Sequence, residues 1–121
     1  MPWTRVALFR EEDGSVPLLD WLDSLPPKVV AKCRVRLERL RDLGHELRRP
    51  EADLLRDGIY ELRIGHQGVN YRMLYFFFGS VAAVVSHGCT KERMVPPIEI
   101  ERAIRRRSLY RANPTRHTQE M

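Results

Sequence analysis

The chain has 121 residues, of which 43% are hydrophobic and 31% are charged, and its formal net charge is +5. This length is typical of one domain with one core, and no apolar run approaches the ~20 residues that a membrane-spanning helix needs. The first residues lack the basic segment and long apolar stretch of a secretory signal, so we expect a soluble, cytoplasmic protein that has no membrane partner.

The excess positive charge lies in the second half of the chain. Residues 1 to 60 carry 11 basic and 11 acidic side chains, whereas residues 61 to 121 carry 10 and 5. Arginine accounts for 18 of the 21 basic residues. Its planar guanidinium suits bidentate recognition of phosphate or carboxylate, although codon bias would produce the same composition.

The first third of the chain predicts one strand and two helices. Residues 3 to 9 are rich in β-forming side chains and run into a polar cluster, which predicts a strand followed by a turn. Ser15 is the expected N-cap of a short helix that stops at the next pair of prolines. Apolar side chains then recur at helical spacing from Pro27 to Leu43, which predicts a second helix closed by Gly44.

The middle of the chain predicts a loop and then three strands. Residues 45 to 57 are polar and show no sustained period, so we expect a loop there. Residues 59 to 65 alternate, and β-rich runs at 70 to 78 and 81 to 87 flank Gly79-Ser80, which predicts a two-residue hairpin. Because short connections join these strands, they should form an antiparallel meander.

The final third predicts a basic helix and a tail. A pair of prolines precedes a helix from Ile98 to about Tyr110, and residues 112 to 121 are expected to be flexible. The order is therefore β-α-α-β-β-β-α within a single α+β domain over residues 1 to 111. Its antiparallel sheet of about four strands should be covered by the two N-terminal helices and followed by the basic C-terminal helix.

The sequence lacks the motifs of the common hydrolases and nucleotide-binding proteins. We find no glycine-rich phosphate loop, nucleophile elbow or paired-carboxylate motif, and Cys33 and Cys89 have no metal-ligand spacing. We therefore expect reduced thiols, no metal and no cofactor. Any activity must then come from basic side chains such as Arg63 and Arg72, which lie on neighbouring predicted strands and can converge on one face.

Each candidate in the sheet also has a structural explanation. Arg63 shares a face with Glu61, and a surface ion pair between them would contribute only ~0 to 1 kcal/mol. Arg72 lies amid apolar residues and either snorkels at the strand end or meets an anion, and we favour the anion. His87 suits acid–base chemistry because its ordinary pKa of ~6.5 lies close to neutrality, but a lone histidine is more often structural.

The remaining candidates follow the last strand of the meander. Lys91 and Arg93 form either a solvated cluster with Glu92 or contacts to phosphate. The run Arg105-Arg106-Arg107 is either a solvated helix face or an extension of an RNA-binding surface, together with Arg93. Tyr110 could stack on a base or lie in the core.

Three blocks carry a resemblance to a known family. They are Leu55-Arg-Asp-Gly-Ile-Tyr-Glu-Leu-Arg63, Tyr71-Arg-Met-Leu-Tyr75 and His87-Gly-Cys-Thr-Lys91. Together they resemble the HigB-like, phage-derived branch of the RelE/ParE type II toxin superfamily, over roughly residues 3 to 111. The resemblance implies a RelE-like fold and a ribosome-dependent mRNA endoribonuclease (an mRNA interferase) that inhibits translation.

The resemblance also implies partners and roles. A helix-turn-helix, HigA-like antitoxin would silence the toxin, which we expect to be a monomer alone and a hetero-oligomer with that antitoxin. Cleavage would be metal-free, by attack of the ribose 2′-hydroxyl on the adjacent phosphate. Arg63 and Arg72 would bind the scissile phosphate, Lys91 would assist the leaving oxygen, and His87 would be the acid or base.

This chain departs from RelE-type members at two places. Those members carry a lysine at the position of Glu61, and an aromatic residue close after the basic loop. ParE-like members of the superfamily share the fold but inhibit DNA gyrase without cutting RNA, since a fold does not fix a function. A ParE-like inhibitor and an inactive, prophage-derived RNA-binding domain are therefore the alternatives to the nuclease.

Overall fold

The structure is a computed structural model that describes residues 3–80 and 82–121, and it combines helices with one sheet. The expectation of an α+β domain is confirmed. In chain order the elements are β1 (Arg5–Phe9), α1 (Pro17–Asp23), α2 (Pro27–Leu43), the 3₁₀ helix η1 (Gly44–Glu46), β2 (Ala52–Arg56), β3 (Ile59–His66), β4 (Val69–Phe78), β5 (Ala82–Lys91), α3 (Pro97–Ala112) and β6 (Thr118–Glu120).

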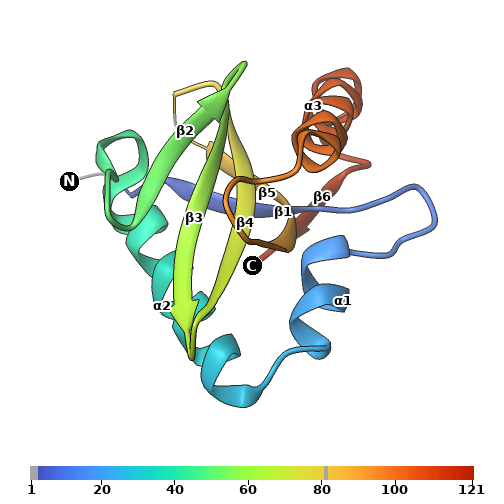
Figure 1. Cartoon of the computed structure of the whole chain (residues 1–121). Coiled ribbons are helices and arrows are strands. Elements are labelled where there is room, and N and C mark those ends of the chain that lie inside the picture. The colour runs from blue at the N-terminus through green and yellow to red at the C-terminus, as the bar shows by residue number, and fades with distance from the viewer. Residues whose placement is uncertain (1–2, 81) are drawn as a thin grey trace.

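The sheet has six strands in the order β2-β3-β4-β5-β1-β6, so the expectation of about four was wrong. The expected meander of β3, β4 and β5 is confirmed, and β2 extends it by one antiparallel strand. The sheet is not purely antiparallel, because β1 pairs with β5 in parallel. Figure 1 shows β1 crossing behind the meander to this position.

The two strands that the sequence does not reveal lie at the two edges of the sheet. β2 falls in the segment expected to be a loop, and β6 falls in the segment expected to be a flexible tail. An edge strand is held by backbone hydrogen bonds on one side only, and charged side chains are tolerated there. Neither strand therefore needs the alternating apolar pattern that reveals a half-buried strand.

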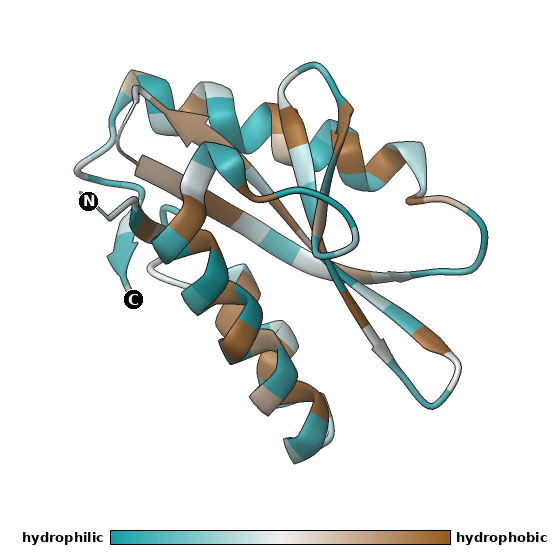
Figure 2. Ribbon diagram, turned by 90° about the vertical axis from the view of Figure 1, so that its left-hand side faces the viewer, coloured by the Kyte–Doolittle hydropathy of each residue, from teal (hydrophilic) through white to brown (hydrophobic). Residues whose placement is uncertain are grey.

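Helices cover both faces of the sheet, which differs from the expected placement. α1 and α2 bury one apolar cluster, which includes Leu18, Cys33 and Leu40 from the helices. α3 buries a second cluster on the opposite face, which includes Ile100, Ala103 and Tyr110. Figure 1 shows α2 and α3 on opposite sides of the strands. In Figure 2 hydrophilic and hydrophobic bands alternate along α2, as expected for a helix with one buried apolar stripe.

Several element boundaries differ from expectation. Val16, not Ser15, is the N-cap of α1, because the Ser15 N–H and hydroxyl donate to Asp13 at 2.9 and 2.7 Å. Phe78 pairs with Ala82 across the predicted Gly79-Ser80 turn. The expected start of the last strand at Val81, and the first two residues of the chain, lie outside the described part. Within that part, no helix combines the length and apolar character needed to cross a bilayer.

One glycine determines how closely α1 approaches the strand that carries several candidates. A Cβ atom added to Gly88 in β5 would lie 2.1 Å from the indole ring of Trp21 in α1. The same ring makes an edge-on contact with Tyr71 of β4, at 6.3 Å between centroids. Gly88 is therefore required by the packing of α1 on this end of β4 and β5.

Candidate functional site

The meander places the basic candidates on one face of the sheet. Arg63 of β3 lies opposite Arg72 of β4, which lies opposite Cys89 of β5. Lys91 at the end of β5 is two residues beyond Cys89, so it shares this face. Arg63 lies between Leu62 and Ile64, whose side chains belong to the apolar cluster under α2. Since side chains alternate along a strand, Arg63 points to the α3 face.

α3 covers only part of this face, and the end near the β3–β4 turn remains open. Arg63 keeps 31% of its side chain exposed, and Lys91 is half-buried. Lys91 lines a hollow of about 850 Å³, together with Asn70, Glu92 and Arg93. We call Arg63, Lys91 and Arg93 the basic sheet end. Lys91 proves to be the last residue of β5 rather than a loop residue.

Arg72 is not available to an external anion, contrary to expectation. Its residue is 4% exposed, its Nε donates to Glu61 at 3.0 Å, and its Nη1 donates to the Tyr71 carbonyl at 2.8 Å. Burial lowers the pKa of Arg72, and the Glu61 carboxylate opposes that shift. Arg72 thus forms a buried ion pair beneath the basic sheet end.

The strand register explains why a carboxylate lies at this point. The Arg63 N–H and carbonyl point away from β4, towards Glu51 and Arg36. Arg63 and Arg72 are therefore a non-hydrogen-bonded cross-strand pair, in which side chains approach most closely and like charges repel. Glu61 lies beside both: its Oε1 is 3.0 Å from Arg72 and its Oε2 is 3.7 Å from Arg63. The expected Glu61–Arg63 pair is present, but Arg72 is the nearer partner.

We expect Arg72→Met alone to lower the free energy of unfolding by about 3 to 5 kcal/mol, because it leaves the buried Glu61 carboxylate without its main partner. Glu61→Leu alone should cost a similar amount. The double variant should recover most of the loss, since a buried ion pair can be replaced by apolar groups at little cost. Urea unfolding of the four proteins gives the coupling energy, and additive losses would contradict the pairing.

His87 is also buried, and it belongs to a polar network beneath α3. Its Nε2 lies 3.1 Å from Glu99 of α3, and its Nδ1 lies 2.7 Å from the hydroxyl of Ser86. Glu99 also accepts from Arg102 at 2.8 Å. Burial, followed by the positive charge of Arg106, lowers the pKa of His87 to about 4. His87 is therefore neutral at pH 7 and anchors α3 to β5, away from the open end of the sheet.

The lowered pKa of His87 predicts a pH-dependent stability. The unfolded chain binds a proton at this histidine below pH ~6.5, whereas the folded chain does so only near pH 4. The contribution is complete above pH ~6.5 and is lost as the pH falls through this window, up to about 3 kcal/mol. Urea unfolding at pH 7 and 4.5 should show a smaller loss for His87→Gln than for the wild type. Equal losses would show that His87 titrates normally in the folded state.

The expected RNA-binding run on α3 does not form one surface. Arg105 is exposed to solvent. Arg106 turns inward, with Nε 3.4 Å from Glu11 and the guanidinium over the Phe9 ring at 5.8 Å, and Arg107 donates to the Asp57 carbonyl. Successive residues of a helix point about 100° apart, so three consecutive arginines reach three surroundings.

Tyr110 is a core residue and not a stacking platform. It is 1% exposed, and its ring meets Phe76 and Phe78 edge-on at 5.9 and 5.1 Å. Its phenol hydroxyl is hydrogen-bonded to the hydroxyl of Thr118 in β6 at 2.9 Å. The segment after α3 therefore folds back and covers this ring.

The described residues contain no group of three or more His, Cys, Asp or Glu side chains that could hold a metal ion. Cys33 and Cys89 are buried free thiols, and burial raises their pKa values to about 11 and about 12. Two partners are not predicted from the sequence, namely Glu61 for Arg72 and Glu99 for His87. The spacing of two residues between Glu61 and Arg63 indicates that Glu61 lies on the same face as the candidate arginines. No sequence pattern indicates the contact of Glu99 with His87.

The comparisons with known proteins place the chain in a family. No curated protein matches the chain. A family model described as "Phage derived protein Gp49-like (DUF891)" matches residues 20–108, from within α1 to within α3. This family is related to the RelE-type toxins. The match includes every strand of the meander and thus the whole basic sheet end, and the chain belongs to the phage-derived, Gp49-like family.

Proposed function

We propose that this protein is the toxin of a type II toxin–antitoxin system, in the HigB-like branch, and that it acts as an mRNA endoribonuclease. The observation that carries the proposal is the register of β3, β4 and β5. It places Arg63 and Lys91 on one face, at the end that α3 leaves open. Family membership supports a toxin-like protein, and the basic sheet end supports a polyanionic substrate.

The proposed reaction is a metal-free transfer within the RNA. The ribose 2′-oxygen attacks the adjacent phosphorus, the bond to the 5′-oxygen breaks, and a 2′,3′-cyclic phosphate and a 5′-hydroxyl form. Arg63 stabilises the charge that develops on the phosphate oxygens, and Lys91 donates a proton to the leaving 5′-oxygen. The exposed carboxylate of Glu92 lines the same hollow and accepts the proton of the 2′-hydroxyl. Arg72 positions Arg63 through Glu61.

The proposal includes partners that follow from the family resemblance. The substrate is mRNA on the ribosome in the cytoplasm, so toxin activity requires translation. A helix-turn-helix, HigA-like antitoxin forms a hetero-oligomer with the toxin, which is otherwise a monomer. Charge complementarity supports both assignments, because a net charge of +5 favours association with rRNA, mRNA or an acidic protein segment.

One observation favours a second candidate, a ParE-like gyrase inhibitor or an inactive RNA-binding domain. His87 and Arg72 are both less than a tenth exposed, so two of the four residues that the family resemblance implies for catalysis cannot touch a substrate in this conformation. A protein that only binds has no need of an exposed acid–base pair. The two candidates differ in one product, the cleaved transcript.

The test is controlled expression in a bacterium, followed by primer extension on abundant transcripts. We expect the wild type to stop growth and to produce cuts that disappear when translation is blocked. Arg63→Ala/Lys91→Ala should lose the cuts by at least about 100-fold, because it removes two charges that stabilise the transition state. Arg72 is not varied here, since its loss should destabilise the fold.

The matched control is Arg105→Ala, which removes an exposed arginine outside the basic sheet end and should leave the cuts unchanged. Growth arrest without cuts, together with inhibition of purified DNA gyrase, would contradict the nuclease and support the ParE-like alternative. Absence of both arrest and cuts would point to the inactive RNA-binding domain.

A further inference from the structure

One edge of β3 has no neighbouring strand over its last residues. β2 pairs with β3 only as far as Ala52 opposite Leu62, and the Glu51 carbonyl accepts from the Arg63 N–H at 2.9 Å. Before Glu51 the chain turns away from the sheet. The edge of β3 from Ile64 onward is therefore open within the described part of the chain.

Gly65 presents its backbone to this open edge. The N–H and carbonyl of Arg63 point away from β4. In an antiparallel pair this direction recurs at every second residue, so the N–H and carbonyl of Gly65 also point away from β4. The Gly65 carbonyl accepts from Lys32 Nζ at 3.0 Å, and the Arg63 carbonyl accepts from Arg36 Nε at 2.9 Å. Among the described residues the Gly65 N–H has no backbone acceptor. Apart from its two chain neighbours, no heavy atom lies within 4 Å of the position that a Cβ atom on Gly65 would take.

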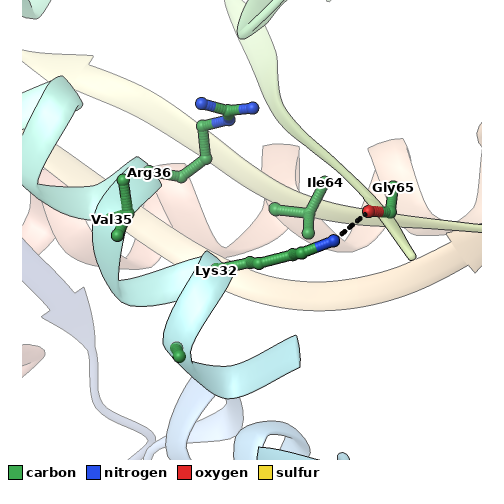
Figure 3. Close-up of a pocket in the computed structure, with 6 residues that line it drawn as sticks. Lys32, Val35, Arg36, Ile64 and Gly65 are labelled. Atoms are coloured by element: carbon green, nitrogen blue, oxygen red, sulfur yellow. Dashed lines mark hydrogen bonds between the residues drawn. The ribbon is translucent and has the colours of Figure 1, made fainter. Parts of the chain in front are cut away.

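An apolar hollow lies directly beside this edge. It has a volume of about 370 Å³ and is lined by Ala31, Lys32, Val35, Arg36, Ile64 and Gly65. Val35 is 52% exposed, although it is a large apolar side chain. Figure 3 shows Lys32 reaching past Ile64 to the Gly65 carbonyl, with the side chains of α2 on one side of the hollow and β3 on the other.

The charge around the hollow is positive. In the described structure no carboxylate lies within 4.0 Å of Lys32, whose partner is the neutral Gly65 carbonyl. Arg36 shares the single carboxylate of Glu51 with Arg39, at 3.1 and 2.9 Å. Of these three cations only Arg36 and Arg39 contact a carboxylate, and an incoming carboxylate would bind Lys32 more strongly than the carbonyl does.

We propose that the open edge of β3 and this hollow form a docking site for an extended, acidic segment of a partner protein. The segment adds beside β3, so that one of its carbonyls accepts from the Gly65 N–H. One apolar side chain enters the hollow between Val35 and Ile64, and flanking carboxylates meet Lys32 and Arg36. An apolar hollow beside a free strand N–H favours a peptide over RNA, whose backbone offers phosphate without apolar side chains.

This site is separate from the basic sheet end. The hollow lies on the α2 face of the sheet, whereas Arg63 and Lys91 point to the α3 face. The inference does not rest on the proposed nuclease, and each can fail without the other. A segment bound here would run past the β3–β4 turn, close to the basic sheet end without covering it.

The test is an NMR titration of the ¹⁵N-labelled protein with a capped seven-residue peptide of alternating glutamate and valine. We expect a saturable shift of the Gly65 amide resonance, downfield in the proton dimension, because this N–H gains an acceptor. The same peptide with lysine in place of glutamate should bind at least about tenfold more weakly.

Charge reversal provides the matched control. Lys32→Glu/Arg36→Glu should reverse the preference between the two peptides, whereas Lys28→Glu/Arg34→Glu, which changes the same charge on α2 outside the hollow, should preserve it. Lys32→Glu alone should reduce the preference about threefold and keeps the Arg36–Glu51 pair, in case the double variant is unfolded.

Three results would overturn the proposal. One is an unchanged Gly65 resonance at saturating glutamate peptide. Another is equal binding of the two peptides by the wild type. The third is a larger shift of the same Gly65 resonance with a seven-nucleotide oligouridylate than with the glutamate peptide. That result would show that the open edge of β3 binds nucleic acid in preference to a peptide.

Discussion

The buried ion pair between Glu61 and Arg72 is the constraint on which the candidate site depends. The register sets two arginines opposite each other on β3 and β4, and Glu61 is the group that compensates their repulsion. As a result Arg72 is held inside the sheet, and only Arg63 remains partly exposed above it. The basic sheet end of Arg63, Lys91 and Arg93 therefore lies above an ion pair whose two charges already neutralise each other.

α3 divides the same face of the sheet into a closed part and an open part. Its inner side is fixed by apolar packing and by the contact of Glu99 with His87, so the polar groups under it are withdrawn from solvent. Residues of one chemical type therefore have different roles. Arg106 is held under α3 by its contact with Glu11, whereas Lys91 lies on the part of the face that α3 does not cover. What a basic residue can bind here depends on its place under or beyond α3.

The periodic parts of the fold could be predicted from the sequence, because burial on one face imposes a repeat. The helix from Pro27 to Leu43 and the meander of β3 to β5 are confirmed for this reason. β2 and β6 could not, since edge strands depend on backbone pairing and not on a side-chain pattern. Alternation correctly placed Glu61 and Arg63 on one face. The burial of Arg72, His87 and Tyr110 depends on α3 and β6, which approach from distant parts of the sequence, and no local pattern reports it.

The measurement that most directly tests this account is the salt dependence of binding to a single-stranded RNA oligonucleotide. Each lost phosphate contact should reduce the slope of log K against log salt by about 0.7 for a single strand. We expect that reduction for Arg63→Ala and again for Lys91→Ala, and no change for Glu61→Leu/Arg72→Met, which removes one charge of each sign beneath the surface. A reduced slope for the Glu61/Arg72 double variant, with unchanged slopes for Arg63→Ala and Lys91→Ala, would show that Arg72 contacts the RNA and would contradict the account.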